Sequence, residues 1–93
     1  MTSELRIKRI FVFANGNTNV VGKFFGPELK ISGRRASLVN ADGAVVQEVV
    51  LIGEVLVRGK TSHEDERVFE TVDRVSISAT EAESGTWRLV IDD

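Results

Sequence analysis

The chain contains one histidine, His63, and a side chain of this kind is a usual starting point for acid–base chemistry. Three acidic residues, Glu64 to Glu66, follow it directly and could assist proton transfer or supply oxygen ligands to a cation. The sequence has no second histidine and no cysteine with which to complete a zinc site, and it lacks a Gly-x-Ser-x-Gly motif. Because consecutive acidic residues usually form a solvated loop, we expect no metal, no cofactor and no catalytic residue here.

The segment Gly59-Lys60-Thr61 has the ending of a phosphate-binding loop. That motif needs four residues between its two glycines, in a flexible loop between a strand and a helix. Five residues separate Gly53 from Gly59, and they are typical of a strand and not of a flexible loop. We therefore expect the end of a strand at this point, and no nucleotide site.

Basic residues gather in the first third of the chain and are interleaved with aromatic ones. The basic set consists of Arg6, Lys8, Arg9, Lys23, Lys30, Arg34 and Arg35. The aromatic set consists of Phe11, Phe13, Phe24 and Phe25. Small β barrels that bind single-stranded nucleic acid combine a basic groove with stacking rings in this way. We favour the simpler interpretation, in which the rings fill a core and the basic residues cover a surface, because the net charge is −2.

The two parts of the chain carry opposite charge. Residues 1–35 hold seven basic and two acidic side chains, which gives +5, whereas residues 36–93 hold five basic and twelve acidic ones, which gives −7. Complementary surfaces of this kind could dock copies of the chain head-to-tail or across a two-fold axis. The seven basic residues are therefore candidate contacts for an anion or for a protein partner.

The elements that must position these residues are predicted to be strands. Alternating apolar residues between Leu5 and Ala14 predict a strand whose second half is covered on both faces, although one face of a helix would also fit. Its β-branched and aromatic residues favour the strand. Asn15-Gly16 suits a tight turn, so residues 20–25 are predicted to return as the second strand of a hairpin.

A second hairpin is predicted around Asp42-Gly43, a strong turn signal between apolar runs. The run from Val45 to Val57 leaves little polar face and is predicted to be the main core strand, with a bulge or bend at Gly53. If one small chain cannot cover this strand, its apolar residues would form an exposed patch that awaits a partner.

Residues 62–74 allow two interpretations. Thr61 and Glu64 have the form of a capping box, which could start a short helix, while Val68 to Val72 are equally good strand residues. We favour a loop followed by a strand. Further on, the alternation within residues 75–79 and again within residues 87–91 predicts a final hairpin.

The 93 residues, 42% hydrophobic and 28% charged, fit one globular domain that spans residues 1–93. Closely spaced short strands predict an all-β fold, an antiparallel sandwich or barrel of about six to eight strands, with room for one short helix within 62–74. Without a signal peptide or an apolar run of membrane-spanning length, we expect no membrane partner and, by default, a cytoplasmic protein.

These observations predict a non-enzymatic protein-binding or assembly module whose partner is another protein or a second copy of the chain. The alternative is a small barrel that binds oligonucleotides through its basic residues and Phe24 or Phe25. An enzyme built around His63 and its neighbouring carboxylates is the third hypothesis.

Overall fold

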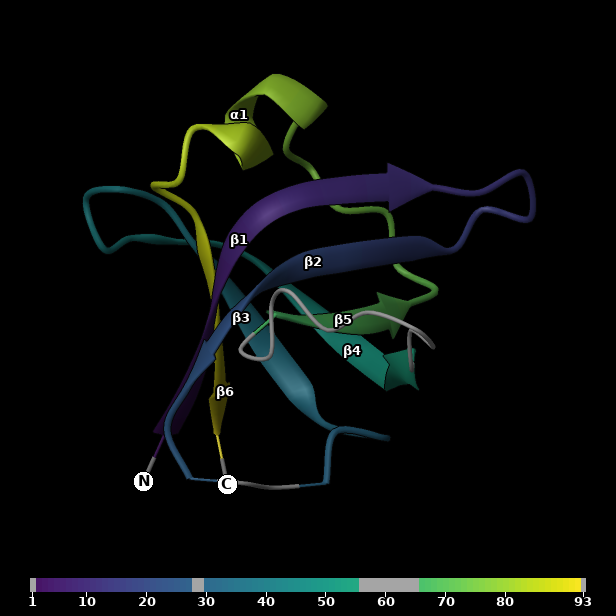
Figure 1. Ribbon diagram of the computed structural model, residues 1–93, viewed down its shortest axis with the longest axis horizontal. Helices are drawn as coiled ribbons and strands as arrows, with labels where there is room; N and C mark the ends of the chain where they lie inside the picture. Colours follow the sequence, from purple (N-terminus) through teal and green to yellow (C-terminus); the bar gives the residue numbers. More distant parts are fainter. Residues whose placement is uncertain (1, 28–29, 56–65, 93) are drawn as a thin grey trace.

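Six strands form a closed antiparallel barrel in the computed structural model, which describes residues 2–27, 30–55 and 66–92 (Figure 1). The strands are β1 Thr2–Val12, β2 Thr18–Phe25, β3 Arg35–Val39, β4 Val45–Val55, β5 Glu66–Thr71 and β6 Arg88–Asp92. They follow one another around the barrel in the order β1-β2-β5-β4-β3-β6, and β6 pairs with β1 to close it. The predicted small antiparallel β barrel is confirmed.

Two of the predicted hairpins are present. In the first, between β1 and β2, the Phe13 amide donates to the carbonyl of Asn17, and Gly16 takes a positive φ of 91°. In the second, between β3 and β4, the side-chain oxygen of Asn40 accepts hydrogen bonds from the amides of Asp42 and Ala44. Asn and Gly at these positions allow the chain to reverse within a few residues.

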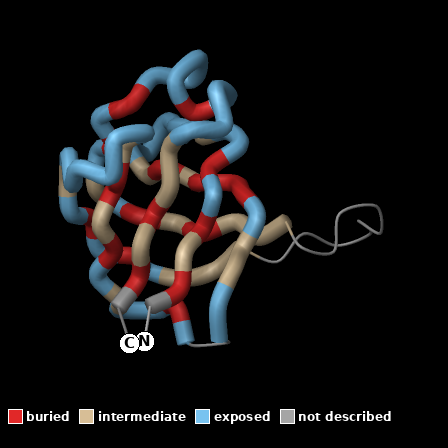
Figure 2. The backbone as a smooth tube through the Cα atoms, turned by 90° about the vertical axis from the view of Figure 1, so that its left-hand side faces the viewer, coloured by how far each residue is buried: buried red, intermediate tan, exposed pale blue. Residues whose placement is uncertain are grey.

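The core lies inside the barrel, where alternate residues of the strands meet (Figure 2). Leu5 on β1, Leu89 on β6 and Leu38 on β3 lie side by side in register, and all three are fully buried. Because side chains alternate between the two faces of a strand, the residues directly before and after each of these leucines point outward. The residues that alternate with the buried ones therefore form the outer surface of the barrel.

One end of the barrel is covered by the segment that follows β5 and by the short helix α1, Ala79–Glu83, which lies over β1 (Figure 1). Gln47 of β4 anchors this segment: its side-chain amide donates to the carbonyl of Arg74 and accepts from the amide of Ser76. The segment in turn buries Val75 and Ile77.

The prediction of a strand over residues 75–79 was wrong. Ser78 begins α1 through a capping box, in which its side chain accepts from the Glu81 amide and the Glu81 carboxylate accepts from the Ser78 amide. The strand that was favoured within residues 62–74 is confirmed, because residues 66–71 form β5. Residues 62–65, where the alternative helix would begin, lie outside the described part of the chain. The strand predicted over residues 87–91 is confirmed, although it begins one residue later, at Arg88.

Two predictions of burial were also wrong. On β4 only Val49 and Leu51 are buried, because the strand belongs to a barrel wall that has one inner and one outer face. The second half of the first strand is not covered on both faces either: Phe11 and Val12 are exposed, and residues 13–14 lie in the turn.

Candidate functional site

Three cations lie side by side on the outer face of β2, β1 and β6. Lys23 pairs with Arg6 across β2 and β1, and Arg6 pairs with Arg88 across β1 and β6. The neighbouring positions, such as Leu5 and Leu89, point into the core, so these three side chains must point outward. We call Lys23, Arg6 and Arg88 the cationic row.

The aromatic ring of Phe25 lies beneath two members of the cationic row. The guanidinium carbon of Arg6 is 4.5 Å from the ring centroid, and the ammonium of Lys23 is 5.4 Å from it. Glu4 supplies one counter-charge, with its carboxylate 3.2 Å from Nε of Arg6. Cation–π contacts of this kind hold long basic side chains over a surface without neutralising them.

Arg88 differs from the other two cations. It is only partly exposed, and its Nε is buried without a hydrogen-bond acceptor among the described residues. A buried donor without an acceptor costs more free energy than an ordinary hydrogen bond contributes, so such groups are rare in folded proteins. Arg88 was not among the predicted site residues, because it lies in the acidic part of the sequence and only the strand register brings it next to Arg6.

Lys8 and Arg9 lie further along β1, where Lys8 is the extra residue in the register shift between Ile7 and Arg9 of the β1–β2 pairing. Both side chains reach the carboxylate of Glu66 on β5, with nitrogen–oxygen distances of 3.3 Å and 3.4 Å. Their charges are therefore partly compensated from within the chain, and they extend the cationic row only weakly.

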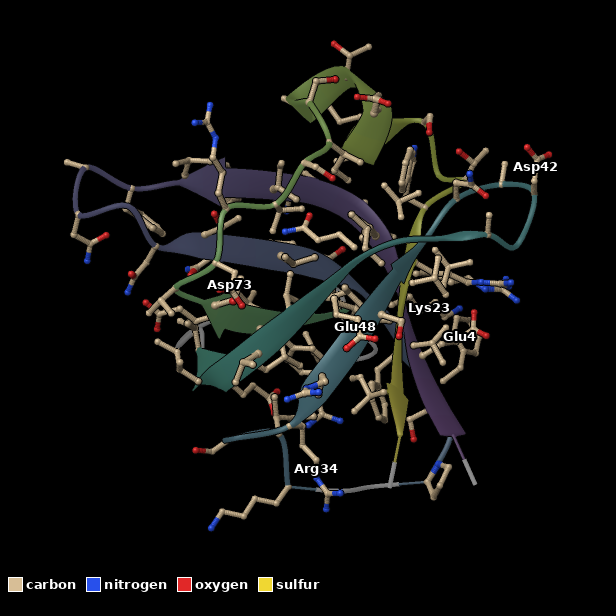
Figure 3. All side chains as sticks on the ribbon, turned by 180° about the vertical axis from the view of Figure 1, so that it is seen from behind. Glu4, Lys23, Arg34, Asp42, Glu48 and Asp73 are labelled. Atoms are coloured by element: carbon tan, nitrogen blue, oxygen red, sulfur yellow. The ribbon has the colours of Figure 1, made fainter. Side chains whose placement is uncertain are left out.

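The other three predicted basic residues lie elsewhere. Arg34 lies apart from Lys23 and Glu4, in the segment that precedes β3 (Figure 3), and its Nε donates to the backbone carbonyl of Lys30. Arg35 is on β3, 3.8 Å from the carboxylate of Glu48. The structure thus brings together four of the seven predicted basic residues, adds Arg88 to them, and separates the rest.

Phe24, predicted as a stacking residue, faces the interior. Its ring packs edge-on against Phe69, with centroids 5.9 Å apart, and the guanidinium carbon of Arg67 lies 4.4 Å from its centroid. Nε of Arg67 also donates to the Glu54 carboxylate at 2.8 Å. Phe24 is therefore engaged by its own chain, which leaves Phe25 as the aromatic residue of the cationic surface.

A second outer surface is apolar and follows β4. Val46, Glu48, Val50 and Ile52 alternate with inward residues, and Val72 lies beside Val50 because Thr71 pairs with Leu51. The exposed apolar residues of this region, which we call the apolar strip, are 40% to 59% exposed and consist of Val45, Val46, Val50, Ile52 and Val72. Two strands separate β4 from β1 in either direction around the barrel, so this strip and the cationic row occupy opposite sides.

The proposed chemistry at His63 falls on residues 56–65, which lie outside the described part of the chain. Over the described ranges, no cluster of three or more histidine, cysteine or acidic side chains is placed to hold a metal ion. Nor does any helix in those ranges have the length and apolar character needed to cross a membrane. The chain matches no protein-family model, no curated protein and no solved structure.

Proposed function

We propose that this chain is a non-enzymatic protein-binding module that associates with a second copy of itself through the apolar strip. The observation that carries the proposal is the exposure of five apolar, β-branched residues on and beside one strand. Contiguous apolar patches on a protein surface commonly mark sites of association.

The way in which the copies associate follows from the closed barrel. Each of the six strands pairs with a neighbour on both sides over at least part of its length, so the closed barrel offers little free edge to a strand from another chain. We therefore expect contact between copies through side chains on the outer face. Val46, Glu48, Val50 and Ile52 stand two residues apart along β4, and the three apolar members of this series present such a row.

Charges beside the strip favour a second copy as the partner. Arg35 on β3 is paired in register with Val50, and Glu48 precedes Val50 on the same face of β4. Their ion pair is long, at 3.8 Å, and the two side chains are 74% and 58% exposed. Across a two-fold axis, Arg35 of one copy can face Glu48 of the other, and the reverse contact forms at the same time.

The overall charge asymmetry of the sequence contributes less to this proposal than the strip does. Lys8 and Arg9 from the basic part already pair with Glu66 from the acidic part within one chain. Part of the predicted complementarity is thus used in folding. Arg35 and Glu48, by contrast, are both well exposed.

The test is the molar mass in solution, measured by sedimentation equilibrium over a range of protein concentrations. The wild-type chain should dimerise, and Val50→Lys should shift the equilibrium to monomer, because the burial of a charge at the centre of an apolar contact is unfavourable. Phe13→Lys is the matched control, since Phe13 is similarly exposed but lies in the β1–β2 turn. A monomeric wild type, or equal effects of the two variants, would refute the proposal.

A charge exchange tests the two-fold arrangement separately. Arg35→Glu and Glu48→Arg should each weaken the dimer, and the double variant should restore it, because the exchanged charges again face each other. A double variant that is weaker than either single one would place Arg35 and Glu48 outside the interface.

A further inference from the structure

We propose that the cationic row, together with Phe25, binds the phosphate backbone of single-stranded nucleic acid on the side of the barrel opposite the apolar strip. The three cations come from three adjacent strands. With adjacent strands about 4.8 Å apart, the row spans roughly 10 Å across the sheet. A row of this length can contact successive negative groups of an extended polyanion.

The first argument is electrostatic. Like charges directly opposite each other on neighbouring strands are unfavourable, and here two such pairs, Lys23 with Arg6 and Arg6 with Arg88, lie in sequence. Glu4 supplies a counter-charge to this group through its contact with Arg6. A bound anion would relieve this repulsion, so the row favours a negatively charged ligand.

The second argument is the unpaired donor on Arg88. Its Nε has no acceptor within the described residues. If the Arg88 guanidinium turned outward beside Arg6, its Nε and one terminal nitrogen could donate to the same phosphate. Arginine prefers this bidentate geometry with phosphate oxygens. Phosphate binding would therefore supply an acceptor that the described residues do not provide.

The third argument concerns the class of polyanion. Proteins that bind single strands combine basic side chains with planar groups on which bases stack. Arg6 already lies over the ring of Phe25. A guanidinium in this position can carry a base on its open side while it contacts a neighbouring phosphate. A chain of acidic residues carries no aromatic base beside each charge, so the surface favours nucleic acid.

The experiment is a fluorescence anisotropy titration with a labelled oligothymidine of about 15 nucleotides, a length within the site sizes of single-strand-binding barrels. Binding should be detectable at low salt. The logarithm of the association constant should fall with the logarithm of the salt concentration with a slope of about −2, as expected for three phosphate contacts to a single strand. Failure to bind at low salt would overturn the proposal.

Arg88→Gln tests the row itself. It should weaken binding several-fold and bring the slope about 0.7 closer to zero, because one phosphate contact is lost. Lys30→Gln removes the same charge from an exposed residue outside the row and should leave both quantities unchanged. Thermal unfolding of both variants shows whether a loss of binding comes from a loss of folding. Equal effects of Arg88→Gln and Lys30→Gln would show that general electrostatic attraction, and not the cationic row, binds the oligonucleotide.

Two further measurements separate the possible outcomes. A polyglutamate peptide should compete poorly with the oligonucleotide, and competition at equal charge concentration would reassign the row to acidic peptides. Val50→Lys should bind the oligonucleotide with the wild-type slope, since it lies on the opposite side of the barrel. This inference and the proposed self-association can therefore fail independently of each other.

Discussion

The α-carbon of Gly22 on β2 lies so close to the backbone carbonyl of Arg6 on β1 that a β-carbon at Gly22 would stand 2.0 Å from that oxygen. Gly22 pairs with Ile7, immediately before the register shift that separates Ile7 from Arg9 in the β1–β2 pairing. The close approach of the two backbones therefore occurs where the pairing changes register, next to the cationic row. A bulge of this kind bends a strand and redirects its side chains.

Gly22→Ala is expected to lower the free energy of unfolding by about 3 kcal/mol, because the backbones of β1 and β2 must move apart to admit the methyl group. Gly53→Ala is the control. A β-carbon at Gly53 meets no atom within 4 Å, so this change should be neutral or stabilise the protein by about 0.5 kcal/mol. Urea denaturation of both variants measures the difference, and equal midpoints would contradict the close contact.

Asp73→Ala is expected to destabilise the barrel at the β4–β5 pair. The Asp73 carboxylate accepts from the Val50 amide at 2.8 Å, next to the register shift between Leu51 and Gly53. Its loss leaves that amide without its acceptor, at a cost of about 1 to 2 kcal/mol.

Asp42→Ala is the matched control for Asp73→Ala, because Asp42 is an exposed residue of the β3–β4 turn. It should cost no more than about 0.5 kcal/mol in the same chemical denaturation experiment. Hydrogen exchange at the Val50 amide gives a local readout. Unchanged protection of this amide in Asp73→Ala would show that the carboxylate is not its acceptor in solution.

Gln47→Leu is expected to release the segment that covers one end of the barrel. Leucine fits beside Leu38, the residue paired with Gln47, but it cannot replace the hydrogen bonds to Arg74 and Ser76. The amide of Ser76 should exchange faster with solvent, and stability should fall by about 1 to 2 kcal/mol. The Phe13 amide, whose acceptor is the Asn17 carbonyl within the β1–β2 turn, should keep its exchange rate. Uniform acceleration at both amides would indicate global destabilisation instead.

Glu54 and Arg67 are expected to be coupled in a double-mutant cycle. Their side chains are only 24% and 17% exposed and form a hydrogen-bonded ion pair between β4 and β5. Glu54→Gln and Arg67→Met should each cost about 1 to 2 kcal/mol, and the double variant should cost less than their sum, because neither partner then remains unpaired. Additive effects would show that the pair contributes little beyond its separate contacts.

Local sequence signals predicted much of the fold. Asn15-Gly16 and Asp42-Gly43 correctly marked two turns, because the conformations that such turns need suit few other residues. The error at residues 75–79 was also local in origin. The sequence contains the capping box of Ser78 and Glu81, but the strand was predicted from the alternation of Val75 and Ile77 alone.

The cationic surface could be predicted only in part. Lys23 and Arg6 lie in strands joined by one short turn, so a hairpin prediction is enough to place them on neighbouring strands. Arg88 is more than eighty residues from Arg6 in the sequence. Its position depends on the closure of the barrel by β6, a long-range pairing that leaves no local pattern in the chain.

The sequence by itself determined the antiparallel β class, two of the turns and the alternation of apolar residues, because backbone preferences and side-chain periodicity act over a few residues. The tertiary structure decided which side of each strand met the core. It left Val50 and Ile52 exposed on β4, paired Lys8 and Arg9 with Glu66, and aligned Arg88 with Arg6. These outcomes depend on strand order and register, which are set by the joint packing of all six strands around one core.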